Sequence, residues 1–206
     1  TLKNALANSV NTVSARIMDM VGPKPVIDLV RKTGVTSRLP NVPSIALGTP
    51  DISLFEMVGA YGTFVNKGIY IEPIIITRIE DKNGMPLFEV VPNTTDVISQ
   101  EAAYVTINLL KGVTKYGSGG RLRHAGLEKT NYVYENVVTG YPYIFDNPIA
   151  GKTGTTQNQS DGWFIGMVPN LVSGVWVGGE DRSVHFEEIA FGQGATMALP
   201  IWGLYM

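Results

Sequence analysis

A run of four residues in the last third of the chain combines one cation with two hydroxyl groups, at positions 152–155. Strand residues two apart point to the same face, so Thr153 and Thr155 can present both hydroxyls to one carboxylate if this segment is a strand. Gly154 leaves room for the backbone of a ligand, and Lys152 supplies the positive charge. These residue types suit the binding of an anionic peptide end.

A phosphate-binding loop is the common alternative for a Gly-Lys-Thr sequence. Such a loop needs two glycines, one directly before the lysine and one five positions earlier, and a helix directly after the Lys-Thr pair. The earlier position holds Asp146, and the residues after Thr153 are a polar turn sequence. The sequence therefore argues against ATP or GTP binding.

A second candidate, Ser9-Val10-Asn11, lies near the start of the chain. Taken alone, a Ser-x-Asn sequence is usually a turn or a helix cap, and Asn11 would cap the helix that we predict from Thr12. The pair Ser9 and Asn11 gains significance only together with the Lys-Thr-Gly segment. Both segments must be brought together by the fold for either to take part in chemistry.

Hydrophobic periodicity and end signals predict the elements that position these segments. We expect helices over residues 12–20 and 25–32, from a Ser53 cap with Glu56 to Gly68, from a Ser99 cap through Leu110, and over 194–206. We expect a hairpin turn at Asn83-Gly84 and three successive strands within 148–156, 161–169 and 171–181. Loops are predicted at 36–51, 116–123 and 130–146.

For several other polar and aromatic residues, a structural role is a better interpretation than a functional one. We expect His124 and His185 on the surface, Trp163, Phe164 and Trp176 in packing, Arg121 and Arg123 in a solvated loop, and Asp161-Gly162 in a turn.

Composition excludes several classes of function. A net charge of −2 argues against nucleic-acid binding, which needs clustered basic residues. The absence of cysteine rules out disulfides, zinc-thiolate sites and a thiol nucleophile within these residues. No apolar run approaches the roughly 20 residues that span a bilayer, and the first residues do not have the pattern of a signal peptide.

The two motifs resemble a known set. Penicillin-binding proteins and related β-lactamases carry Ser-x-x-Lys, Ser-Asp-Asn and Lys-Thr-Gly; residues 9–11 resemble the second motif and residues 152–154 the third. Longer phrases resemble class A penicillin-binding proteins in particular, among them PSIALGTPDISLFEMVGAYGTFVNKGIYIEP, GSGGR, AGKTGTTQNQSDGWFIGMVP and VSGVWVGGED. No serine or threonine has a lysine three positions later. We therefore expect residues 1–206 to be the C-terminal portion of a transpeptidase domain, with the Ser-x-x-Lys segment upstream.

The resemblance implies a fold and a role for each motif residue. The fold would be α/β (α+β): a mainly antiparallel sheet flanked by helices, of the β-lactamase and transpeptidase type, incomplete in this chain. As catalytic residues, Ser9 would relay a proton, Asn11 would hydrogen-bond the stem-peptide amide, and Lys152 would orient Ser9. Thr153, Gly154 and Thr155 would bind the substrate carboxylate, and the Thr155 N–H would form half of an oxyanion hole.

The implied activity of the parent protein is serine-type D,D-transpeptidation of peptidoglycan, on the extracytoplasmic face of the bacterial inner membrane. Stem peptides and β-lactam antibiotics would be its ligands, with no metal, organic cofactor or nucleic acid. A membrane anchor and a glycosyltransferase domain would lie upstream, and this chain alone would be inactive. The alternatives are a D,D-carboxypeptidase or β-lactamase-like hydrolase, and a non-catalytic interaction domain.

Overall fold

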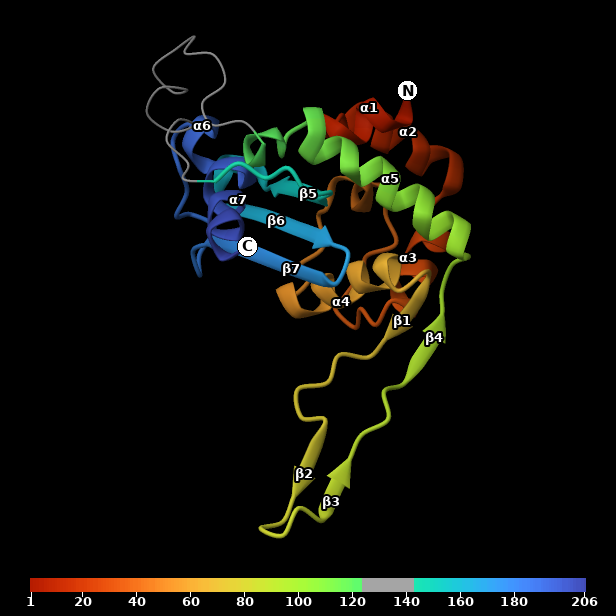
Figure 1. Ribbon diagram of the computed structural model, residues 1–206. Helices are drawn as coiled ribbons and strands as arrows, with labels where there is room; N and C mark the ends of the chain where they lie inside the picture. Colours follow the sequence, from red (N-terminus) through yellow and green to blue (C-terminus); the bar gives the residue numbers. More distant parts are fainter. Residues whose placement is uncertain (124–142) are drawn as a thin grey trace.

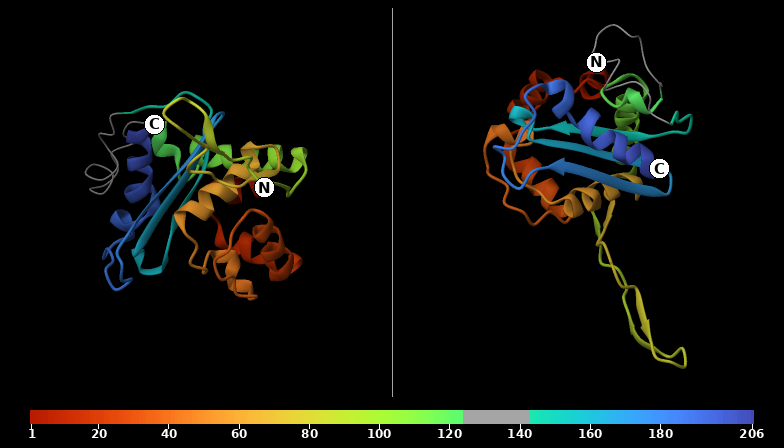
Figure 2. Two further views of the ribbon diagram at one scale, coloured as in Figure 1. Left: turned by 90° about the horizontal axis from the view of Figure 1, so that it is seen from below. Right: turned by 90° about the vertical axis from the view of Figure 1, so that its left-hand side faces the viewer.

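A three-stranded antiparallel sheet lies between two groups of helices in the computed structural model, which describes residues 1–123 and 143–206 (Figures 1 and 2). The α-helices are α1 (Leu2–Ala7), α2 (Asn11–Val21), α3 (Pro23–Lys32), α4 (Leu54–Val65), α5 (Gln100–Tyr116), α6 (Ile189–Gly192) and α7 (Gly194–Tyr205). The strands are β1 (Ile69–Ile71), β2 (Arg78–Glu80), β3 (Pro86–Glu89), β4 (Thr94–Asp96), β5 (Ala150–Thr155), β6 (Asp161–Val168) and β7 (Leu171–Gly178). Short 3₁₀ helices cover Pro43–Leu47, Gly120–Leu122 and Gln157–Gln159. The predicted α/β class with an antiparallel sheet is confirmed.

The sheet has the order β5-β6-β7, so β6 is central, and among the described residues one edge of β5 has no strand partner. Thr153 lies opposite Phe164, and Lys152 lies opposite Ile165. Residues that are directly opposite in an antiparallel pair share a face. This register therefore places Lys152 on the same face of the sheet as Ile165, and Thr153 on the same face as Phe164.

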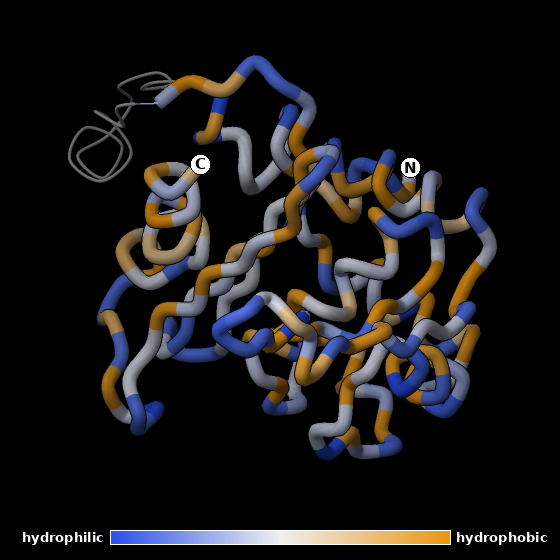
Figure 3. Tube along the Cα trace, turned by 60° about the horizontal axis from the view of Figure 1, so that its bottom comes forward, coloured by the Kyte–Doolittle hydropathy of each residue, from blue (hydrophilic) through white to orange (hydrophobic). Residues whose placement is uncertain are grey.

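Helix α7 covers one face of the sheet. Phe164 and Trp202 are buried there with their ring centroids 5.2 Å apart, in an edge-to-face arrangement. Gly166 lies directly under Trp202, so that a Cβ at this position would collide with the indole ring. Hydropathy colouring shows mainly apolar and neutral residues along the sheet and α7, and hydrophilic residues in the turns (Figure 3). This face holds the main hydrophobic core.

Helices α4 and α5 lie on the other face of the sheet, where Leu110, Ala150 and Met167 form a second buried cluster. The helix α4 begins at the predicted cap, since the Ser53 Oγ accepts a hydrogen bond from the Glu56 N–H and the Glu56 carboxylate accepts one from the Ser53 N–H. This capping box fixes where the helix starts.

A long two-stranded arm extends from the body of the molecule (Figures 1 and 2). Strands β1 and β4 pair at its base, and β2 and β3 pair at its tip. The tip turns at the predicted Asn83-Gly84 position, where Gly84 has a φ of +81°. The hairpin prediction is therefore confirmed.

Two sequence-based interpretations of turns and caps are wrong. Asn11 is the first residue of α2 and Val10 is its N-cap, so Asn11 does not cap the helix. Asp161 and Gly162 begin β6 and do not form a turn. Turn propensity is a local signal, and pairing with a neighbouring strand overrides it here.

The two arginines of the glycine-rich loop are also not solvated as expected. The Arg121 guanidinium donates to the Ala195 carbonyl at 3.1 Å. Arg123 donates to the carbonyls of Phe145 and Asn147, both at 2.8 Å. These two side chains therefore join the loop to the C-terminal half of the chain.

Other expectations fall partly outside the described residues. His124 and positions 130–142 of the predicted long loop lie outside them. His185 is exposed and Phe164 is fully buried, as predicted. Within the described ranges, no helix is both long and apolar enough to cross a membrane.

Candidate active site

The Lys152 ammonium links the two sequence motifs. On β5 the Lys152 side chain points to the face that carries α4 and α5, opposite to its neighbours in the strand. Its Nζ donates to the Ser9 Oγ at 2.8 Å and to the Thr153 carbonyl at 2.7 Å. Ser9 and Lys152 are 143 positions apart in the chain, so only the tertiary structure brings them together.

Ser9 is held in place by a tight turn between α1 and α2. Its φ of +54° lies in the left-handed region, which is uncommon for residues other than glycine. The turn is closed by a hydrogen bond from the Val10 N–H to the Ala5 carbonyl, and the Ser118 N–H donates to the Ala7 carbonyl next to it. A strained position held from both sides is typical of functional sites.

Asn11 follows this turn as the first residue of α2, and its side chain is exposed. It lies two positions after Ser9 in the chain. The structure thus brings Ser9 and Lys152 into direct contact, and Asn11 is next to them only through its place in the chain.

The two threonines share the other face of β5, as their alternation predicts. The Thr153 Oγ1 is 2.6 Å from the Ser118 Oγ, and the Thr155 Oγ1 accepts a hydrogen bond from the Gly194 N–H at 3.0 Å. Thr153 is almost buried, whereas Thr155 is exposed. Each hydroxyl oxygen can form a further hydrogen bond, so these contacts orient the hydroxyls without using them up.

Ser118 is a candidate site residue that the sequence analysis did not single out. It lies directly after α5, where Gly117 packs so closely on the Ala7 carbonyl that no side chain fits. The GSGGR sequence was the available signal, because a serine between glycines suits a loop with a close backbone approach. Only the tertiary contact with Thr153 places Ser118 at the site.

Backbone groups at the edge of β5 are also available. Thr156 N–H donates to the Asp161 carbonyl across the strand pair. Because donors alternate along an antiparallel strand, the N–H groups of Thr153 and Thr155 point away from β6, towards the free edge. The Thr155 N–H is therefore placed to donate to an oxygen atom at this edge.

Burial lowers the pKa of Lys152 to about 8, because the charged ammonium loses part of its hydration. The ordinary pKa of lysine is about 10.4. A lysine with a pKa near neutrality can exchange a proton with a neighbouring hydroxyl such as that of Ser9.

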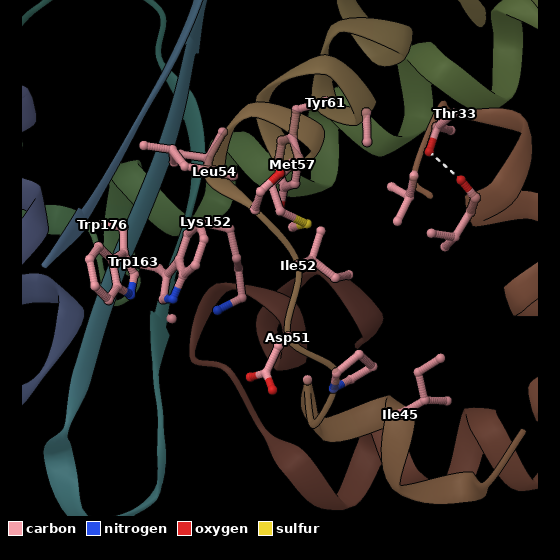
Figure 4. A pocket seen from close by; sticks show the side chains of 18 of the residues that line it. Thr33, Ile45, Asp51, Ile52, Leu54, Met57, Tyr61, Lys152, Trp163 and Trp176 are labelled. Carbon is pink, nitrogen blue, oxygen red and sulfur yellow. Dashed lines mark hydrogen bonds between the residues drawn. The ribbon is translucent and has the colours of Figure 1, made fainter. Parts of the chain in front are cut away.

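A cavity of about 920 Å³ opens beside Lys152, between the sheet and the helices α3 and α4 (Figure 4). Lys152, Trp163 and Trp176 line its sheet side, and mainly apolar residues, among them Met57 and Tyr61, line the helical side. Within the described residues, the buried Thr63 hydroxyl in this wall has no hydrogen-bond partner. The lining is mostly apolar, and Lys152 places a cation in its sheet wall.

An arginine bridges two walls of the cavity. Arg182 follows β7 and forms an ion pair with Asp51, in the segment before α4. Its Nε lies 3.7 Å from the carboxylate of Asp161, which is only 5% exposed at the start of β6. Residues 1–123 and 143–206 contain no cluster of three or more His, Asp or Glu side chains suited to a metal ion.

Comparison with known proteins identifies the family. The model of the family described as "Penicillin binding protein transpeptidase domain" matches residues 1–179. The chain belongs to this family. It is 33% identical over 206 residues to penicillin-binding protein 1A of Aquifex aeolicus, covering 100% of this chain and 25% of that protein. It is 32% identical over 183 residues to penicillin-binding protein 2D of Bacillus subtilis, covering 89% of this chain and 24% of that protein.

Solved structures of penicillin-binding proteins have the same fold. Penicillin-binding protein 1A from Haemophilus influenzae superposes with a TM-score of 0.80 at 24% identity, over 99% of this chain and 33% of that one. PonA1 from Mycobacterium tuberculosis in complex with penicillin V gives 0.72 at 23% identity, over 98% of this chain and 55% of that one. The chain spans about a quarter of the length of the curated relatives named above.

Proposed function

We propose that the full-length protein is a serine-type D,D-transpeptidase that cross-links peptidoglycan stem peptides and is acylated by β-lactams. The proposal depends above all on the 2.8 Å contact between Lys152 and Ser9. This contact joins the residues that resemble the second and third motifs of penicillin-binding enzymes. Residues 1–206 would form the C-terminal portion of the transpeptidase domain.

The nucleophilic serine would come from a Ser-x-x-Lys segment outside these residues, because the sequence contains no such motif. The cavity beside Lys152 supports this proposal. At a helix diameter of about 10 Å and a rise of 1.5 Å per residue, 920 Å³ corresponds to roughly eight residues of helix. A Ser-x-x-Lys motif needs only one helical turn.

The reaction would proceed through an acyl-enzyme. The serine gives its proton to the lysine of its own motif as it attacks the penultimate D-alanine carbonyl. The bond to the terminal D-alanine then breaks, and Ser9 relays that proton to the departing nitrogen. Lys152 orients Ser9, and Asn11 hydrogen-bonds the stem-peptide amide. An amino group of a neighbouring stem then attacks the acyl carbon and releases the serine.

The substrate carboxylate would bind at the β5 edge. Thr153 and Thr155 donate their hydroxyls to it, and Gly154 leaves room for the peptide backbone. The Thr155 N–H stabilises the negative oxygen of the intermediate, a contribution of about 3 kcal/mol for one such donor. The Lys152 charge keeps this part of the cavity attractive to anions.

The ligands and location follow from this assignment. Stem peptides would be the substrates, and β-lactams would mimic their D-Ala-D-Ala end; a structural relative is described in complex with penicillin V. Stem peptides are joined outside the cytoplasmic membrane, so the domain would lie on the extracytoplasmic face. A membrane anchor and a glycosyltransferase domain would belong to the upstream part of the full-length protein.

A fluorescent penicillin tests whether the full-length protein is acylated. Full-length protein incubated with a fluorescent penicillin should give a labelled band on a denaturing gel, because the acyl adduct survives denaturation. The chain of residues 1–206 alone should give none. Lys152→Ala in the full-length protein should lower the labelling rate by roughly 10²-fold, the usual scale for loss of proton-transfer assistance.

The product decides between the proposal and its alternatives. A cross-linked dimer of stem peptides identifies a transpeptidase, whereas release of D-alanine without cross-links identifies a carboxypeptidase. An unlabelled full-length protein with a native circular dichroism spectrum would contradict acylation and indicate a non-catalytic interaction domain.

A further inference from the structure

The arm formed by residues 69–96 packs on α4 through β1 at its base, and its outer part, with β2 and β3, extends away from the body (Figures 1 and 2). An isolated two-stranded hairpin is marginally stable in water, and three or more strands with an apolar face are needed for independent stability. The arm exposes many large apolar side chains. In its outer part they are Ile74, Ile75, Ile76, Ile79, Met85, Leu87, Phe88 and Val91, with Ile75 and Val91 exposed by 88% and 86%.

The two edges of the arm differ in their capacity to pair with another strand. Strand β3 begins with Pro86, which has no N–H to donate. The segment 74–80, which leads into β2, contains no proline and consists largely of isoleucine. An exposed edge of this kind is a template for pairing with a further strand.

The backbone groups that are free on β2 can be identified. The Val90 N–H donates to the Thr77 carbonyl. Because bonding alternates along an antiparallel strand, Thr77 and Ile79 direct their backbone groups to β3. Arg78 and Glu80 direct theirs outward, where they are available to another chain.

The charges on β2 are complementary to those of a second copy of the same strand. If two β2 strands pair antiparallel around a twofold axis at Ile79, each Arg78 lies opposite the Glu80 of the other copy. The outward backbone groups of these same residues then face one another. Within one chain, the two side chains already form an ion pair at 2.6 Å. Opposite charges directly across a strand pair stabilise it.

We propose that the arm is a homodimerisation site, at which two copies of the protein pair their β2 strands antiparallel around Ile79. The two hairpins form a four-stranded sheet with the order β3-β2-β2-β3. Ile79 and Phe88, which are opposite each other and about half exposed, come together with their counterparts on one face. The charged residues gather on the other face. A twofold contact of this kind is closed, so it yields a dimer and not a filament.

Cysteine cross-linking at the axis tests the geometry. Residues 1–206 contain no cysteine, so the full-length protein needs replacement only of any cysteine elsewhere. Ile79 would meet Ile79 of the second copy as a non-hydrogen-bonded pair, at a Cα separation of about 4.5 Å, which a disulfide can bridge. Ile79→Cys should therefore give an oxidised dimer. Leu87→Cys is the matched control, since the β3 strands are three strand spacings apart, about 14 Å.

A charge experiment tests whether the pairing is between copies. In the Ile79→Cys background, Arg78→Glu or Glu80→Arg alone places like charges opposite each other, and each should lower the dimer yield roughly tenfold. Mixing the two variants, one with a larger tag, should restore a disulfide-linked heterodimer. Neither variant has the ion pair within its own strand, so only pairing between chains gives this recovery.

Two results would overturn the proposal. One is cross-linking of Ile79→Cys and Leu87→Cys to the same extent, which indicates random collision. The other is a folded Ile79→Cys protein that stays monomeric under oxidation. Protection of the amides of residues 74–80 from hydrogen exchange in that monomer would show that another part of its own chain covers the arm. Measuring the circular dichroism spectrum of every variant ensures that a lost dimer is not an unfolded protein.

Discussion

Lys152 shows how a single residue depends on its surroundings for its chemistry. Its partly buried ammonium lies beside a mostly apolar cavity and contacts the Ser9 hydroxyl at 2.8 Å. The same burial lowers its pKa to about 8, close enough to neutrality for proton exchange. Ser9, in turn, is held in a left-handed conformation that few side chains adopt. Both the burial of the Lys152 charge and the left-handed backbone of Ser9 cost free energy. Local sequence alone does not explain why the protein maintains them.

This shift predicts a pH dependence at the residue scale. If the charged form of Lys152 supports acylation, the labelling rate with a fluorescent penicillin should fall as pH rises through about 8. It should be about tenfold lower at pH 9 than at pH 7 for a single group with this pKa. Lys152→Arg should react more slowly but lose the decline, because a guanidinium stays charged at these pH values.

Unfolding would not explain such a decline. A lysine whose pKa is lowered by folding binds fewer protons in the folded state between pH 8 and about 10.4, so stability rises with pH across this range. Identical profiles for the wild type and Lys152→Arg would mean that another group titrates, and would contradict the role given to Lys152.

At the scale of elements, Glu56 connects helix α4 to a distant loop. Its carboxylate completes the capping box with Ser53 and also accepts hydrogen bonds from the backbone N–H groups of Thr36 and Ser37, at 2.7 and 2.9 Å. The Ser37 hydroxyl, which donates at 2.6 Å, has the largest effect in holding the pKa of Glu56 well below its usual range. Charge-assisted bonds of this kind are stronger than neutral ones.

Glu56→Gln should therefore lower the free energy of unfolding by about 1 kcal/mol, allowing for its partial exposure. Because folding lowers the pKa of Glu56, its contribution is fully present above the ordinary glutamate pKa of about 4.3 and is lost as pH falls below it. Thermal unfolding at pH 7 and pH 3 measures this, and the difference between wild type and variant should shrink in acid.

Glu101→Gln is the matched control. Glu101 lies in the first turn of α5 and interacts with its own cap, Ser99. Its replacement should have a smaller effect at pH 7. Equal losses for the two variants would mean that the contacts of Glu56 with the loop at 36–37 do not contribute.

At the scale of the whole molecule, the sheet separates a packed core from an open cavity. The face under α7 is filled by Phe164, Leu199 and Trp202, which are essentially inaccessible to solvent. The face towards α3 and α4 retains about 920 Å³ of space next to Lys152. Rigidity on the first side supports the geometry of β5, whose other side carries the candidate site.

Close packing on the α7 side can be tested at Gly166. A Cβ there would collide with the Trp202 ring, so Gly166→Ala should destabilise the domain by about 2 kcal/mol, as overpacking usually does. Gly120→Ala is the control, since a Cβ at Gly120 meets no atom within 4 Å. Thermal unfolding compares the two, and an unchanged midpoint for Gly166→Ala would show that Trp202 moves aside freely.

Local signals in the sequence correctly predicted those parts of the structure that depend on neighbouring residues. The Ser53–Glu56 capping box, the turn at Asn83-Gly84 and the strand that carries Lys152 are all found where expected. The family resemblance was equally local, because it depended on short phrases in the right order. Helix caps, turns and strand alternation are set within a few residues, which is why sequence is sufficient for them.

Only the tertiary structure decided the rest. It brought Ser9 to Lys152 across 143 positions, paired Ser118 with Thr153, and placed Asp161 in a strand where the local pattern predicted a turn. It also left a cavity beside one face of the sheet and an arm whose outer part extends away from the body. These features arise from packing and strand pairing between distant segments. The interaction energy of such contacts depends on both segments, so no short stretch of sequence predicts it.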